Sequence, residues 1–466
     1  MTLSRIIPQE DQLCKTWYAL YFVNFFVMGV GRYVSYPMPV SLLVELFYFA
    51  CIIASASDEN NKGNIGRAAC TMLWLYLPWV IYSLLEAGNM SSQIAFNVIF
   101  TRWFAEIRNM GFQVVYGMLV CAAIFVKKGQ LLTMYKVWGL CILICTGKTL
   151  MQQYMGFDYA EAAFLAGGGA RTHMVNGIIR YFSLFPDAAT HGCCMAASAA
   201  TFSAVTLSVS NKHEKIFFAI CTLAAAYSMM ASGTRTGIFV LGVGIMVYAA
   251  LSKRIAAIVT SCILGGIFLG VLIFTDIGQG NSMIRRMRSA FNKDDASMAV
   301  REMNQQAMER YVNELPLGLG AGIRTGDIPP SNKNYYLSIV PPDSTWVYVN
   351  IRYGNLGKYI FLFSFFSICL YAGIICFFRI RDPELRGLLA GLTSGATAMV
   401  VAGYANHIQL QYPNCFIFFG QLVIVYLGPQ MDARIAEEQL QKDKELLAQS
   451  EQLQKDKELL AQSEQE

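Results

Sequence analysis

Apolar segments of roughly 20 residues alternate with short polar connections along most of the chain. A segment of this length can cross a bilayer as a helix, because each backbone hydrogen bond closes within the segment. The pattern therefore predicts an all-α, polytopic integral membrane protein of about 12 transmembrane helices. The predicted spans are 16–35, 37–56, 69–87, 110–126, 131–147, 184–209, 215–231, 237–251, 255–275, 345–378, 387–404 and 413–428.

Composition agrees with this class of protein. Hydrophobic residues make up 55% of the 466 residues and charged residues only 14%, against about 25% charged residues in soluble domains. The 13 cysteines lie almost entirely in apolar segments without metal-ligand or disulfide spacing, so we interpret them as packing residues. The net charge of +5 is modest and no arginine–aromatic strip is present. We therefore expect no nucleic-acid partner, no metal and no other cofactor.

Lysine and arginine in the short connections indicate how the helices cross the membrane. They gather in alternate connections, around 62–67, 127–128, 212–215, 253–254 and 379–386, and the charged C-terminal tail falls on the same side. Both termini are therefore predicted to be cytoplasmic. The opposite, outer face then carries 88–109, 148–183, 232–236, 276–344 and 405–412.

The long outer segment divides the chain into four parts. Residues 1–275 carry nine predicted spans, 276–344 form a large, partly helical extracytoplasmic loop, and 345–428 carry three more spans. The tail 429–466 contains a 13-residue tandem repeat, since residues 438–450 recur unchanged at 451–463. Its residues favour a helix but its leucines keep no clean heptad, so we predict a solvated cytoplasmic helix. Weak self-association is the less favoured alternative.

Two stretches carry more local predictions. The run 345–378 is too long for one simple span, and Gly354 and Gly357 interrupt it early. Its start is therefore expected to be a separate short helix at the membrane surface. The stretch 91–108 has an amphipathic pattern with Arg102 and Arg108 on its polar side. Both a helix lying in the interface and an ordinary connecting helix fit that pattern.

Arginines are the main candidates for chemistry. Arg235 lies in Ser-Gly-Thr-Arg-Thr-Gly at 232–237, a very short outward turn where a charge near hydrocarbon is usually functional. A snorkelling arginine is the alternative, but threonines and glycines flank it instead of an aromatic belt. Arg180 precedes Asp187, a plausible helix N-cap, and on its own favours a structural interpretation. His191 and His407 are interpreted as satisfied polar groups at helix ends.

The outer segment adds further candidates. Arg301 and Arg310 are nine residues apart, about two and a half helical turns, so they cannot share one helix face well. The turn Pro316–Gly322 reads Pro-Leu-Gly-Leu-Gly-Ala-Gly, and its glycines permit close backbone approach to another group. The pair Asp294-Asp295 resembles the carboxylates that hold a divalent ion on a diphosphate. It stands alone, however, and is interpreted as part of a solvated loop.

Together these features resemble the bacterial O-antigen polymerase and ligase family of lipid-linked glycan transferases. The resemblance covers most of the chain, through the spans and the large late outer loop. Three short motifs carry it: Ser232–Gly237, then an arginine at Arg301 leading into Pro316–Gly322, then Asp343-Ser-Thr-Trp-Val with Gly354-Asn-Leu-Gly. The stretch from Arg180 to Asp187 is similar to a further stretch common in the polymerases. Family ligases typically carry histidine where this chain has Asp343, which favours polymerase over ligase.

The resemblance implies glycosyl transfer on the outer face of the bacterial inner membrane. The donor would be an undecaprenyl-diphosphate-linked oligosaccharide and the acceptor another lipid-linked repeat unit. Arg235 and Arg301 would stabilise the leaving diphosphate without a metal, and Asp343 would be the base. We expect Arg180, Arg324, Arg310 and Arg352 to bind substrate. The helices would contact membrane lipid, and a protein that regulates chain length is a candidate partner.

A polysaccharide flippase or secondary transporter is the alternative of a different class, since 12 spans are also common there. Such proteins usually keep polar or charged groups at mid-membrane and show broken helices in two related halves. Here the charges crowd the outer rim, and no repeat of spans is visible. Transport is therefore the less favoured interpretation.

Overall fold

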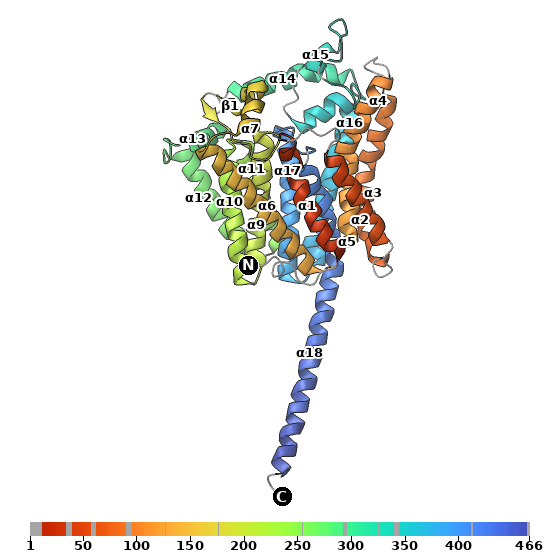
Figure 1. Ribbon diagram of the computed structural model, residues 1–466, viewed down its shortest axis with the longest axis vertical. Helices are drawn as coiled ribbons and strands as arrows, with labels where there is room; N and C mark the ends of the chain where they lie inside the picture. Colours follow the sequence, from red (N-terminus) through yellow and green to blue (C-terminus); the bar gives the residue numbers. More distant parts are fainter. Residues whose placement is uncertain are drawn as a thin grey trace.

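The structure is a computed structural model that describes residues 12–33, 40–56, 62–89, 96–125, 127–175, 177–253, 255–291, 296–324, 326–339, 344–411 and 413–463. Its helices form a bundle from which one long helix projects (Figure 1). The α-helices are α1 Gln12–Val30, α2 Val40–Ala56, α3 Lys62–Leu85, α4 Phe96–Ile107, α5 Gln113–Ile124, α6 Lys128–Tyr154, α7 Tyr159–Phe164, α8 Ala170–His173, α9 Ala188–Ser208, α10 Lys212–Ala231, α11 Thr236–Ser252, α12 Ile255–Phe274, α13 Ser282–Arg288, α14 Ala296–Asn313, α15 Tyr335–Ile339, α16 Thr345–Ile374, α17 Pro383–Ala405 and α18 Val423–Ser463. Strands β1 Met174–Val175 and β2 Ile178–Ile179 form an antiparallel pair.

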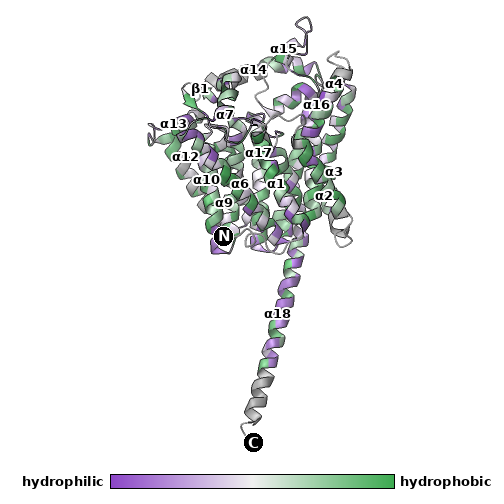
Figure 2. Cartoon of the chain, viewed as in Figure 1, coloured by the Kyte–Doolittle hydropathy of each residue, from purple (hydrophilic) through white to green (hydrophobic). Residues whose placement is uncertain are grey.

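The helices confirm an all-α membrane protein. A helix overlaps each of the 12 predicted runs. By length and composition, seven helices among the described residues can cross a membrane. Figure 2 shows the apolar body that they build, with more polar segments above it and along α18. The count of 12 spans stays a prediction. The seven are Gly66–Gly88, Ile99–Ile124, Lys128–Tyr154, Lys212–Ala231, Thr345–Arg379, Pro383–Ala405 and Cys415–Leu453.

Helix α9 lies at the centre of one half of the bundle. It is rich in alanine, glycine and serine, and nearly all of its residues are buried. Glycines let its neighbours come close. A Cβ added at Gly244 of α11 would lie 2.5 Å from the Ala200 Cβ, and one at Gly387 of α17 would lie 1.9 Å from the Ser208 Oγ. Small residues are the usual means by which membrane helices pack closely without a hydrophobic driving force.

Contacts between loops show which of them lie at the same end of the bundle, and those given below agree with the grouping that the charge pattern predicts. At the α18 end, Lys128 lies 3.3 Å from Glu384, and the Arg381 backbone N–H donates to Asp432. At the other end, which we call the rim, Asn89 donates to the Leu317 carbonyl. Figure 1 shows α13, α14 and α15 at the rim and α18 projecting from the opposite end. Which end faces the cytoplasm stays a prediction.

The stretch 91–108 is not a separate interfacial helix over its described residues. Helix α4 continues through a π-helical turn, Arg108–Phe112, directly into α5. That turn is held in place, because the Met110 carbonyl accepts hydrogen bonds from the Tyr76 hydroxyl at 2.8 Å and the Trp79 indole at 3.0 Å. The amphipathic pattern therefore belongs to the rim end of a long helix.

Helix α18 runs unbroken past the expected boundary between span and tail at residue 428. The tail is helical through Ser463, as predicted, and it is exposed over residues 436–453. Its leucines at 440, 446, 447 and 453 are each 57–62% exposed.

Candidate functional site

The turn Ser232–Gly237 joins α10 to α11 at the rim. Gly233 has a φ of +58°, which favours glycine. The Ser232 hydroxyl accepts from the Thr234 backbone N–H at 3.1 Å. The Thr234 hydroxyl then donates to the Ala188 carbonyl at 2.8 Å, which ties the turn to the start of α9. The turn is thus a fixed part of the bundle.

Two arginines flank this turn. The Arg180 guanidinium donates to the Ser232 carbonyl at 3.4 Å and to the Thr234 hydroxyl at 3.1 Å. The Arg286 Nε donates to the Gly233 carbonyl at 2.7 Å. A Cβ at Gly233 would lie 3.0 Å from the Arg286 Cδ and 3.4 Å from the Arg180 Cγ. Glycine therefore lets both side chains pack against the turn.

Arg235 extends this group toward α13. It is half-buried, and its NH1 lies 3.5 Å from both the carbonyl and the hydroxyl of Ser289. We call Arg180, Arg235 and Arg286 the arginine cluster. Sequence reasoning selected the first two but did not select Arg286, which is one of several arginines at 285–288. Its contact with the Gly233 carbonyl places it against the turn, which its position in the sequence did not indicate.

Asp187 caps the start of α9, as predicted. One carboxylate oxygen accepts from the backbone N–H groups of Ala189 and Thr190 at 2.8 Å each. The Thr190 hydroxyl bonds the other carboxylate oxygen and also the Gln411 side chain, both at 2.7 Å. Arg32 holds the turn before the cap, donating to the carbonyls of Phe185 and Pro186 at 2.5 and 2.6 Å.

Asn406, just after α17, joins the starts of two other helices. Its Nδ2 donates to the Thr236 hydroxyl at 2.5 Å. Its carbonyl accepts from the Thr345 hydroxyl at 3.0 Å. Thr236 directly follows Arg235, and Thr345 lies two residues after Asp343. Asp343 itself lies outside the described residues.

A second group of polar side chains lies at the start of α16. The Tyr348 hydroxyl donates to Glu106 at 2.5 Å, and Arg352 lies 3.5 Å from the same carboxylate oxygen. The Arg352 guanidinium also lies 4.2 Å from the centre of the Tyr348 ring. The His407 ring stacks on Tyr348 with their centres 4.0 Å apart. We call these four residues the Glu106 cluster.

Sequence reasoning did not select Glu106 or Tyr348. Glu106 lies in the amphipathic stretch 91–108, whose pattern indicated Arg102 and Arg108 as the polar residues. A carboxylate within an otherwise apolar helical pattern was the available signal.

The glycine-rich turn has a structural partner. The backbone N–H groups of Leu319 and Gly320 donate to the carbonyls of Ile351 and Arg352, each at 2.9 Å. Gly354 breaks α16 with a φ of +69°, and a Cβ there would lie 2.1 Å from the Pro316 carbonyl oxygen. The close approach that the glycines permit is therefore to α16 itself. The predicted break near the start of this helix is confirmed at Gly354, whereas Gly357 lies within regular helix.

The remaining predicted site residues are dispersed. Arg310 is exposed on α14, and Arg324 is exposed near Asp327, whose carboxylate accepts from the Arg324 backbone N–H at 2.7 Å. Arg352 belongs to the Glu106 cluster. Arg301 lies within α14, but its side chain is outside the described part of the structure, as are Asp294 and Asp295. The structure therefore brings together Arg180 and Arg235, and does not bring Arg310 or Arg324 to them.

Three histidines lie at the rim. His191 is satisfied, with Nδ1 3.0 Å from the Tyr181 carbonyl and Nε2 3.5 Å from the Thr149 hydroxyl. His173 is also satisfied: Nδ1 lies 2.8 Å from the Gly169 carbonyl, and Nε2 accepts from the Ala188 backbone N–H at 3.2 Å. Burial lowers the pKa of His173, and the positive charges of the neighbouring Arg180 and Arg32 lower it further. For His407 the described residues do not show the expected satisfaction, because its buried Nδ1 has no hydrogen-bond partner among them.

The fold defines an all-α membrane protein, and its rim carries a cationic cluster beside a mixed acidic and aromatic one. No model of a known protein family matches the chain, and a search of curated proteins finds no match either.

Proposed function

We propose that the protein is a lipid-linked polysaccharide polymerase. It would transfer glycan from an undecaprenyl-diphosphate donor to a lipid-linked repeat unit at the rim. The observation that carries the proposal is the link through Asn406, which brings Thr345, at the start of α16, next to the turn that carries Arg235. Asp343 precedes Thr345 by two residues in the sequence. Two motifs separated by more than 100 residues thus meet beside the arginine cluster. In this proposal the remaining apolar helices also span, which makes 12, the rim is periplasmic and both termini are cytoplasmic.

The arginine cluster suits a diphosphate leaving group. As the bond between the sugar C1 and the diphosphate oxygen breaks, negative charge develops on that oxygen. Guanidinium groups bind phosphate oxygens in a bidentate manner, and groups held in position beforehand stabilise this charge most effectively. Arg180 and Arg286 are held by carbonyls of the turn. We propose that Arg235 and Arg301 complete this site.

The acceptor hydroxyl needs a base near the attacking oxygen. Asp343 is the candidate that the sequence motif names, and direct displacement would invert the anomeric carbon. Aspartate at this position also favours a polymerase over a ligase that transfers polymer to lipid A-core.

Polymer synthesis by purified protein tests the proposal. Labelled undecaprenyl-diphosphate-linked repeat units, extracted from the organism that makes the protein, would be added to the purified protein in detergent. The products would then be separated on gels. We expect a ladder from the wild type and its loss in Arg235→Ala and Arg301→Ala, with a fall of about 100-fold or more. Arg381→Ala, which removes an exposed arginine at the α18 end, is the matched control. Normal ladders from well-folded arginine variants would exclude the assignment.

Transport is the second candidate, and one observation favours it. Asn24 of α1 is 1% exposed, and its side-chain amide has no hydrogen-bond partner among the described residues. The last predicted span also begins with irregular helix over residues 415–422. Buried polar groups and broken helices are typical of transporters. Transfer of label in detergent, where no gradient exists, would exclude transport as the primary activity, and lipid A-core as the required acceptor would indicate a ligase.

A further inference from the structure

We propose that the imidazole of His407 accepts the proton of the acceptor hydroxyl during glycan transfer. This inference rests on the proposed polymerase function and names a base different from the one that the sequence motif suggests. It makes the segment after α17 part of the reaction centre.

The hydrogen bonding of His407 differs from that of the other two histidines at the rim. Each ring nitrogen of His173 and His191 faces a backbone or hydroxyl partner, which is what a structural histidine requires. The Nδ1 of His407 is buried and has none among the described residues, which do not include Asp343 or Tyr412. A buried polar atom without a partner lowers the stability of the folded protein. An unexplained cost of this kind, in a polar site, points to a group that is bound only during function.

The position of His407 is nevertheless tightly fixed. The preceding residue, Asn406, is bonded to both Thr236 and Thr345. The His407 carbonyl accepts from the Gln411 side chain at 2.7 Å. The ring stacks on Tyr348, whose own hydroxyl is held by Glu106. The ring is therefore positioned by neighbours that do not use its nitrogens, as expected of a preorganised base.

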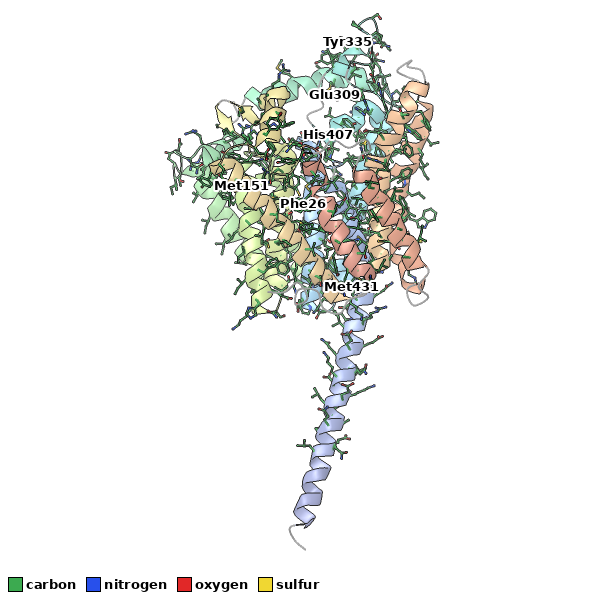
Figure 3. The ribbon with its side chains drawn as sticks, in the orientation of Figure 1. Phe26, Met151, Glu309, Tyr335, His407 and Met431 are labelled. Carbon is green, nitrogen blue, oxygen red and sulfur yellow. The ribbon has the colours of Figure 1, made fainter. Side chains whose placement is uncertain are left out.

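His407 also lies between the two clusters. Its segment contacts the arginine-bearing turn through Asn406 and the capped start of α9 through Gln411 and Thr190. Its ring belongs to the Glu106 cluster. In Figure 3, His407 lies in the upper part of the helical body, below Glu309 of α14. An acceptor sugar held there would be next to the donor diphosphate on the arginine cluster.

Burial, more than the neighbouring charges, keeps the imidazole neutral. Burial and the Arg352 guanidinium lower the pKa of His407 to about 4, and the Asp187 carboxylate opposes this in part. Tyr348 and Glu106 are the other titratable groups of this cluster. The ring is therefore unprotonated at neutral pH and can accept a proton.

The step is balanced as follows. The acceptor oxygen forms a bond to C1 of the donor sugar while the bond between C1 and the diphosphate oxygen breaks. The bonding electrons leave with undecaprenyl diphosphate, whose charge the arginines stabilise. The hydroxyl proton passes to His407 and then to water.

Two variants separate a chemical role from a packing role. His407→Phe keeps an aromatic ring on Tyr348 but cannot accept a proton, and His407→Gln keeps polarity without basicity. We expect both to lower kcat by about 100-fold or more and to bind labelled donor as the wild type does. His213→Gln, which changes an exposed histidine on α10, is the matched control and should leave kcat unchanged. Arg235→Ala, in contrast, should lose donor binding.

The pH profile gives a second readout. The wild-type rate should fall as the pH drops through about 4, and residual activity of the His407 variants should lack that acidic limb. Wild-type kcat and an unchanged pH profile in His407→Phe, with activity lost in Asp343→Asn, would overturn the inference while leaving the polymerase function intact. If the wild type itself transfers no glycan, the proposed function fails, and this inference fails with it.

Discussion

Asn406 donates a hydrogen bond to the hydroxyl of Thr236 at 2.5 Å, across 170 residues of sequence. The same residue accepts from Thr345, so one asparagine joins the end of α17 to the starts of α11 and α16. Each of these helix starts carries a candidate catalytic motif. The geometry of the rim therefore depends on a residue that would itself contact no substrate in the proposed reaction.

Replacing Asn406 tests this dependence. Asn406→Ala removes the amide that bonds Thr236 in a buried setting, so we expect a loss of about 1–3 kcal/mol in the free energy of unfolding. Activity should fall as well, because the two motifs lose their connection. Asn355→Ala removes an amide whose hydrogen bond to Asn313 is exposed to solvent, and this change should cost less than about 0.5 kcal/mol. Thermal unfolding in detergent measures both, and equal effects would show that Asn406 has no special role.

The Gly233 position controls the arginine cluster. Gly233→Ala would force a residue with a Cβ into a φ of +58° and press that Cβ against Arg286. We expect about 1–3 kcal/mol of destabilisation and weaker donor binding, because Arg180 and Arg286 must move. Gly242→Ala in α11 meets nothing within 4 Å and should be neutral or stabilising. Unchanged donor binding in a folded Gly233→Ala protein would contradict the role of the cluster.

We expect His173 to make the stability of the protein depend on pH. Its pKa is lowered by burial, so the folded protein holds it neutral while the unfolded chain protonates near pH 6.5. The stability that it contributes is therefore present above about pH 6.5 and is lost as the pH falls toward its folded pKa. Protonation would also remove the Nε2 acceptor of the Ala188 N–H. We expect thermal unfolding to shift down between pH 7 and pH 5 in the wild type.

The control is the same titration in a His173→Gln protein. Its stability should start lower and change less over this interval, because the titrating group is gone. A wild-type shift that persists at full size in the variant would assign the pH dependence to other groups.

The sequence by itself determined the helices and several of their ends. Apolar runs of sufficient length form helices wherever lipid or protein surrounds them, so class and approximate positions followed from local pattern. The Asp187 cap and the break near the start of α16 are likewise local, since they depend on residues within one turn. What local pattern left open was continuity: α4 runs into α5, and α18 runs from the last predicted span into the tail.

Only the tertiary structure decided which polar residues belong together. Tyr348 and Glu106 are 242 residues apart, and no short-range pattern relates them. Arg286 resembles its neighbours in sequence, and its contact with Gly233 appears only once the chain is folded. The glycines of Pro316–Gly322 indicated close approach, but only packing showed that α16 is what they approach. Helix formation depends on neighbours along the chain, whereas a site depends on distances that the packing of the whole bundle sets.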